Sequence, residues 1–176
     1  MPSSARIVSP SNIPFRRDAT RRRPLVIEIR TILAPTDFSV HASAAVRYAC
    51  ALAEKFGAAL HLLHVLSEIV PVGPDPMLAP VFAPEFYQES EASAREALET
   101  ALNPSWGRPV SVETFVRWGS PVETVIGHAS KHSIDLIVIA THGRTGLSHI
   151  FLGSVAERIV REGPCPVLTI RDRTNG

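Results

Sequence analysis

Short apolar runs alternate with amphipathic segments along most of the chain. The run at residues 25–34 is rich in β-branched side chains, which is typical of a buried strand. Apolar residues then recur at helical spacing over 45–56, with Asp37 and Ser39 available to cap the start and Gly57 to end the segment. This pattern predicts a strand followed by a helix that packs on it.

The alternation continues to the end of the sequence. A second apolar run covers 58–66, interrupted only by His61 and His64, and is short enough for a strand buried on both faces. The stretch 67–84 holds five prolines and one glycine and is expected to be a long loop. Ser120-Pro121-Val122-Glu123 is a capping box that opens another helix. The remaining expected elements are helices at 85–102 and 153–162 and strands at 110–118, 136–140 and 166–170.

Five strands that alternate with helices predict a single α/β domain over residues 25–173. Right-handed crossovers place the helices on both faces of a five-stranded parallel sheet. Ligands of such sheets bind beyond the carboxyl ends of the strands, where the strand order reverses. We therefore expect the chemistry at Asp37, at Val65 and in the segment that follows Ala140.

The segment from Ala140 to Val155 has the pattern of a phosphate-binding loop. It leaves an apolar strand, passes Gly143 and Arg144, and enters a helix at Gly153-Ser154. Glycine allows the backbone to approach a ligand closely, and a helix start presents N–H groups and a positive dipole end. Neither a Walker A loop nor a G-x-G-x-x-G fingerprint is present. Ser154 has two interpretations, as a phosphate contact or as the first residue of a capping box that ends at Glu157.

These motifs resemble the universal stress protein family over residues 30–171. The resemblance is carried by Ala34-Pro35-Thr36-Asp37-Phe38-Ser39, His64-Val65, Thr141-His142-Gly143-Arg144, Gly153-Ser154 and Cys165-Pro166-Val167. The nucleotide-binding branch of that family has the motif G-x2-G-x9-G-[S/T], and Gly143, Gly153 and Ser154 match it. Ala140 stands where the motif has its leading glycine, and its methyl group lies where the ribose is expected. The resemblance implies a Rossmann-like fold of the adenine nucleotide alpha hydrolase type.

By this resemblance the ligand is ATP, with Mg²⁺ or Mn²⁺ held by its phosphates. Adenine is expected near Pro35 and Asp37, with the Val65 backbone along its edge, and ribose near Asp37 and Ala140. Asp37 also has a second interpretation as a helix cap. The full set of candidate ATP-binding residues is Pro35, Asp37, Val65, Ala140, Thr141, His142, Gly143, Arg144, Thr145, Gly153, Ser154 and Val155.

The family resemblance further implies a nucleotide-responsive stress regulator with at most slow ATP hydrolysis, and not an enzyme. One alternative is a nucleotide-free dimeric interaction module of the same fold, which Ala140 favours. Another is an ATP-using enzyme of related architecture, such as an ATP pyrophosphatase or an aminoacyl-tRNA synthetase core. The Ser-Gly-Gly, HIGH and KMSKS signatures of those enzymes are absent from the sequence.

Charge, hydrophobicity and cysteine content limit which classes of partner and which cellular location are expected. The first 24 residues carry six arginines and one aspartate, and we expect them to form a disordered basic extension. The rest of the chain has 12 basic and 16 acidic residues, so nucleic acid is not an expected partner. No apolar run reaches the ~18 residues of a membrane span. Cys50 and Cys165 are too few for a disulfide framework, which favours a cytoplasmic location.

The histidines predict no zinc site. His61 and His64 are three apart on a strand, so their side chains point to opposite faces. His128 and His132 are four apart on a helix, but the sequence identifies no third ligand for them.

A homodimer is expected through the final strand, from Pro166 to Ile170. That strand is predicted to lie at a sheet edge, where unpaired backbone groups are a template for pairing. Val167, Leu168 and Ile170 are expected to face the open side.

Overall fold

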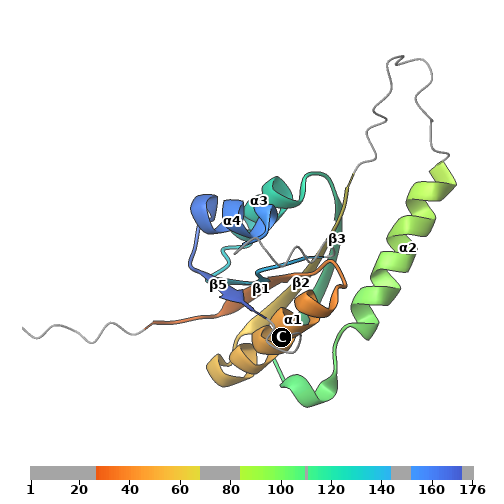
Figure 1. The fold of residues 1–176 in the computed structure, drawn as a ribbon. Coiled ribbons are helices and arrows are strands. Elements are labelled where there is room, and N and C mark those ends of the chain that lie inside the picture. The colour runs from red at the N-terminus through yellow and green to blue at the C-terminus, as the bar shows by residue number, and fades with distance from the viewer. Residues whose placement is uncertain (1–26, 68–83, 110, 144–151, 172–176) are drawn as a thin grey trace, which may run out of the picture.

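A computed structural model describes residues 27–67, 84–109, 111–143 and 152–171. Within them the chain forms one five-stranded parallel sheet in the order β3-β2-β1-β4-β5 (Figure 1). The strands are β1 (Thr31–Pro35), β2 (Ala59–Leu66), β3 (Val112–Trp118), β4 (Leu136–Ala140) and β5 (Val167–Ile170). The helices are α1 (Val40–Phe56), α2 (Pro84–Thr100), α3 (Pro121–Lys131) and α4 (Ser154–Glu162), with one 3₁₀ turn, η2 (Pro104–Trp106). The predicted α/β class and parallel sheet are confirmed.

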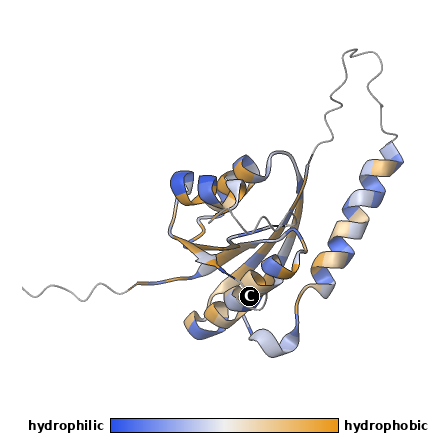
Figure 2. Ribbon diagram, viewed as in Figure 1, coloured by the Kyte–Doolittle hydropathy of each residue, from blue (hydrophilic) through white to orange (hydrophobic). Residues whose placement is uncertain are grey.

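Helices cover both faces of the sheet. Alternate strand residues point to opposite faces, so Ile32 joins the core beneath α1 and α2 whereas Leu33 joins the core beneath α3 and α4. Figure 1 shows α3 and α4 together on one side of the sheet and α1 on the other. Figure 2 shows hydrophobic colour along the strands and hydrophilic colour on the outer surface of α4. No helix among the described residues has the length and apolarity to cross a membrane.

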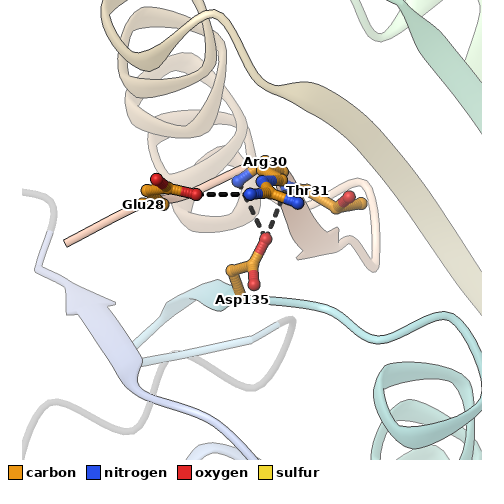
Figure 3. Close-up of polar contacts among 4 residues, drawn as sticks. All are labelled: Glu28, Arg30, Thr31 and Asp135. Atoms are coloured by element: carbon orange, nitrogen blue, oxygen red, sulfur yellow. Dashed lines mark hydrogen bonds and ion pairs between the residues drawn. The ribbon is translucent and has the colours of Figure 1, made fainter. Parts of the chain in front are cut away.

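The Asp135 carboxylate holds the start of β1, the central strand of the sheet. Asp135, just before β4, accepts hydrogen bonds from the backbone N–H groups of Arg30 (2.8 Å) and Thr31 (2.9 Å) (Figure 3). The Asp135 N–H donates in turn to the Thr31 carbonyl at 3.0 Å. Glu28 forms an ion pair with Arg30. These contacts set the start of β1 against β4, the two strands between which the strand order reverses.

Three local expectations are wrong. The first strand begins at Thr31, because residues 27–30 are not part of a strand and the Arg30 N–H donates to Asp135 instead. Ser120 precedes α3 as its N-cap, but its side chain makes no capping hydrogen bond, so the predicted capping box is absent. Ile170 is only 8% exposed because it packs in the core beneath α1, not on an open side.

Candidate functional site

A cavity of about 690 Å³ opens at the carboxyl ends of β1, β2 and β4. This volume lies within the range of small-molecule sites. The cavity is lined by ten of the predicted residues, namely Pro35, Asp37, Val65, Ala140, Thr141, His142, Gly143, Gly153, Ser154 and Val155. Arg144 and Thr145 lie outside the described residues. A cavity therefore lies beyond the strand-order reversal, where the ligand site was predicted, and the roles of its lining residues stay predictions.

Asp37 lies in a tight turn between β1 and α1. Its Oδ1 accepts a hydrogen bond from the Ser39 N–H at 3.0 Å, and the Thr36 hydroxyl accepts one from the Phe38 N–H at 3.1 Å. The N-cap of α1 is Ser39, whose hydroxyl accepts from the Ala42 N–H. Asp37 therefore supports the turn ahead of the helix, and is not itself the cap.

The other oxygen of Asp37 lies close to Gly143, and both residues line the cavity. A Cβ atom on Gly143 would lie 2.8 Å from Asp37 Oδ2, which is closer than real contacts allow. Because Oδ1 is anchored to the Ser39 N–H, the carboxylate has little freedom to move away. Glycine at 143 thus allows the loop after β4 to reach the turn after β1.

Backbone groups of β2 also face the cavity. The Leu63 carbonyl accepts from the Thr36 N–H on the β1 side (2.9 Å), whereas the Leu66 carbonyl accepts from the Gly119 N–H on the β3 side (3.0 Å). Val65 follows Leu63 by two residues, so its N–H and C=O point to the β1 side, where β1 has already ended. These two groups occupy the place that a further strand would pair with.

The start of α4 presents backbone N–H groups at the opposite wall. Gly153 is the N-cap, and its carbonyl accepts from the Glu157 N–H at 2.9 Å. Ser154 is therefore the first residue of the helix, and its interpretation as the cap is wrong. N–H groups in a first helical turn have no partner within the helix, and they carry the positive end of its dipole. The Ser154 side chain is exposed beside them.

Gly153 is held close to the end of β4. Its N–H donates to the Thr141 carbonyl at 2.7 Å, and a Cβ atom at 153 would lie 3.2 Å from the same oxygen. Its φ of −65° suits any residue, so close approach, not backbone conformation, is what favours glycine here.

Ala140 is the departure from the family motif. The residue is buried at the end of β4, where it pairs with Ile170 of β5. It belongs to the core beneath α1 and also lines the cavity. Its methyl group therefore packs partly against the core beneath α1.

Sequence reasoning missed His64 as part of the site. Its Nδ1 donates to the Thr36 carbonyl at 2.7 Å, and its ring lies 4.4 Å from the Phe38 ring. Phe38 has φ +63°, an uncommon conformation for a bulky residue that the contact with His64 supports. The sequence did not indicate this role, because the partners of His64 lie in the turn after β1, which is distant in the sequence.

Three other histidines come together on the opposite face of β2. The distance from His61 Nδ1 to His128 Nε2 is 3.1 Å, and the His128 and His132 rings stack at 4.2 Å. The sequence identified no third ligand for His128 and His132, and the structure brings His61 to them, with one ring nitrogen from each of the three within 4.8 Å of the others. Burial lowers the pKa of His61, and lowers the pKa of His128 to about 4, so both are neutral at pH 7.

Comparison with known proteins gives one consistent match. Residues 28–171 match the Universal stress protein family. The chain is 32% identical over 142 residues to Universal stress protein MJ0531 of Methanocaldococcus jannaschii, which covers 81% of this chain and 82% of that protein. The structure is similar to that of MJ0577 from the same organism (TM-score 0.69, 27% identity, 85% of this chain and 100% of that one). It is also similar to UspA from Lactobacillus plantarum (TM-score 0.67, 28% identity, 82% and 99%).

Proposed function

Because this chain belongs to the universal stress protein family, we propose that it binds ATP in the cavity at the carboxyl ends of β1, β2 and β4 and acts as a nucleotide-responsive stress regulator. The observation that carries the proposal is the wall formed by Gly143, Gly153 and the start of α4. Backbone N–H groups, a helix dipole and close backbone approach are what a polyphosphate requires.

The opposite wall suits adenosine. The Val65 N–H and C=O offer one donor and one acceptor side by side, which complement the edge of adenine. Asp37 lines the same cavity as Val65 and Gly143, and its carboxylate is proposed to accept from a ribose hydroxyl. Apolar side chains of Leu63, Val125 and Ile139 complete the lining around the base.

Mg²⁺ or Mn²⁺ would accompany ATP through the phosphate oxygens. Among the described residues that line the cavity, Asp37 is the only carboxylate. Magnesium is usually held by one or two carboxylates together with substrate phosphates and water. A single carboxylate does not form a protein cage for the ion, so the residues fit a metal that arrives with the nucleotide.

The same lining favours a regulator over a catalyst. Hydrolysis of ATP at enzymatic rates needs a positioned base or water-orienting group together with charge stabilisation at the γ-phosphate. The titratable groups among the described lining residues are Asp37, His64 and His142, of which Asp37 accepts from the Ser39 N–H in the turn and His64 donates to the Thr36 carbonyl. We therefore propose at most slow hydrolysis, below about 1 s⁻¹. The cytoplasm is the proposed location, since Cys50 and Cys165 are both free thiols.

The alternative is a nucleotide-free interaction module of the same fold, and Ala140 is the observation that favours it. Two solved universal stress proteins hold adenine nucleotides, cAMP in one and dAMP in a protein of Archaeoglobus fulgidus. At 22% and 20% identity these proteins share the fold with this chain, so the case for binding rests on the cavity itself.

Nucleotide content and cell phenotype test the two parts of the proposal separately. Full-length protein purified without added nucleotide should release ATP or ADP on denaturation, whereas the Gly153→Val variant should release none. Cells that lack the protein should survive starvation or oxidative stress less well, and Gly153→Val should fail to restore survival. A folded, nucleotide-free wild type favours the interaction module. Restoration of survival by Gly153→Val contradicts the nucleotide-responsive role.

We also propose a homodimer through β5. The strand lies at the sheet edge, and Leu168 is 37% exposed on it. An antiparallel pairing of β5 with its copy would satisfy the edge groups and leave both cavities open. Sedimentation equilibrium should give a dimer for wild type and a monomer for Leu168→Lys. Val160→Lys is the control, because Val160 is 46% exposed and lies on α4, not on the edge strand. A monomeric wild type, or a dimer that survives Leu168→Lys, contradicts this interface.

A further inference from the structure

The three clustered histidines come from elements far apart in the sequence. His61 lies on β2, on the face that packs against α3, while His128 is in the last turn of α3 and His132 is its C-cap residue. Spacing of four residues places the two helical imidazoles on one side of α3, where their rings stack at 4.2 Å. The His61 ring lies 5.3 Å from each of them. Packing of α3 on the sheet thus converges three imidazoles on one point.

We propose that His61, His128 and His132 bind a divalent transition-metal ion of the zinc class. Neutral imidazole is a preferred ligand of Zn²⁺, Co²⁺ and Ni²⁺, and three histidines with one open position form a known zinc coordination set. His61 and His128 are buried, and His132 is half-buried, so an ion would reach the cluster from the His132 side. None of the three histidines lines the nucleotide cavity.

The nitrogen separations suit a tetrahedral ion after small movements. At a Zn–N distance of about 2.0–2.1 Å, two ligand nitrogens of a tetrahedron lie about 3.3 Å apart. His61 Nδ1 and His128 Nε2 are 3.1 Å apart, so this pair is already at that spacing. The ligand nitrogens all lie within 4.8 Å of one another, and the half-buried His132 has room to close the remaining gap.

A carboxylate and an aromatic ring lie beside the first two ligands. With His61 Nδ1 directed at His128, its Nε2 faces Glu113 Oε1 at 3.8 Å. This separation is too long for a hydrogen bond, but closer approach of the exposed carboxylate would fix the ring and raise its basicity as a ligand, an arrangement that recurs at zinc sites. The Phe115 ring forms an apolar wall, with its centroid 4.5 Å from that of His128. Arg117 and Lys131 are the cations near the cluster, and Glu113 is the acidic group that opposes them.

The cluster shares no residue with the lining of the nucleotide cavity. The cavity takes β2 residues from Leu63 onward and α3 residues up to Val125, whereas His61 precedes Leu63 by two residues and the helical histidines lie at the end of α3. Metal binding is therefore measurable without ATP, which would itself bind the ion.

The test is a Co²⁺ titration of the full chain, without a polyhistidine tag and without nucleotide. Wild type should bind one Co²⁺ per chain with the intense visible bands of a four- or five-coordinate ion, and Zn²⁺ should displace it. His132→Gln should abolish the bands, since it removes the half-buried ligand with the least disturbance of the core. Glu113→Gln should retain the bands and weaken binding by roughly 10- to 100-fold, as expected of a group that orients a ligand.

His41→Gln is the control, because His41 lies near His142 and outside the cluster, and it should bind as wild type does. Circular dichroism checks that each variant is folded. Absence of Co²⁺ bands in wild type overturns the proposal, as do bands that survive in folded His132→Gln. If His132→Gln does not fold, the exposed Glu113→Gln decides: unchanged affinity there overturns the arrangement around His61.

Discussion

Replacement of Gly153 by valine should remove ATP binding and leave the chain folded. A Cβ atom at this position would lie 3.2 Å from the Thr141 carbonyl, an oxygen that is also bonded to the Gly153 N–H at 2.7 Å. The oxygen belongs to the backbone, so relief requires movement of the loop after β4 or of the first turn of α4. Either movement displaces the N–H groups that are proposed to hold the phosphates.

An upper limit can be set on the free energy of unfolding that Gly153→Val removes. Overpacking of this kind destabilises a protein by about 1–3 kcal/mol. Valine is also a poorer N-cap than glycine, by up to about 1 kcal/mol. The total is below the roughly 5–15 kcal/mol by which domains are stable, so the variant should fold. Loss of phosphate contacts should weaken ATP by at least ~30-fold, which corresponds to about 2 kcal/mol.

Urea denaturation and equilibrium dialysis of ATP with Mg²⁺ measure the two effects. Gly127→Ala is the matched control, because Gly127 lies within α3 and a Cβ atom there has no neighbour within 4 Å. It should stabilise the chain by roughly 0.5–1 kcal/mol and leave ATP affinity unchanged. A folded Gly153→Val protein with wild-type affinity would refute the proposed phosphate position.

Three further changes probe other parts of the account. Ala140→Gly should leave ATP affinity equal or higher in calorimetry, and a large loss would show that the ribose lies elsewhere. Asp135→Ala should destabilise the chain by about 1.5–3 kcal/mol in urea denaturation, because the N–H groups at the start of β1 lose a charged acceptor. Wild-type stability would contradict this anchor. Burial raises the pKa of the Cys50 thiol to about 11, so at pH 8 only about one molecule in a thousand carries its thiolate. A thiol reagent should therefore modify Cys50 mainly on unfolding, later than the partly exposed Cys165, and immediate modification of Cys50 in native protein would contradict its burial.

The fold could be predicted because its signals are local. Gly57 ends α1 in the left-handed conformation, φ +65°, which the sequence position of the glycine indicated. The cavity could be placed because parallel strands deliver their carboxyl ends to one edge, so Asp37, Val65 and Gly143 had to lie near one another. The hydrophobic pattern does not fix element boundaries to a single residue. It therefore could not decide whether Ser154 was the N-cap or the first helical residue of α4.

The contacts that the sequence did not reveal depend on packing between distant segments. His61 and His128 are 67 residues apart and meet only because α3 lies over β2 in one particular register. Ile170 is buried because β5 lies against the core beneath α1, which the edge position of the strand did not indicate. Neither contact produces a periodic pattern of hydrophobic residues in the sequence.

Calorimetric titration of ATP into the full-length protein, with Mg²⁺ and again with EDTA, tests the central claim most directly. The account predicts saturable binding of one ATP per chain that is stronger with Mg²⁺, since the ion offsets phosphate charge that Asp37 would otherwise oppose. No saturable binding to folded, nucleotide-free protein in the presence of Mg²⁺ would contradict it.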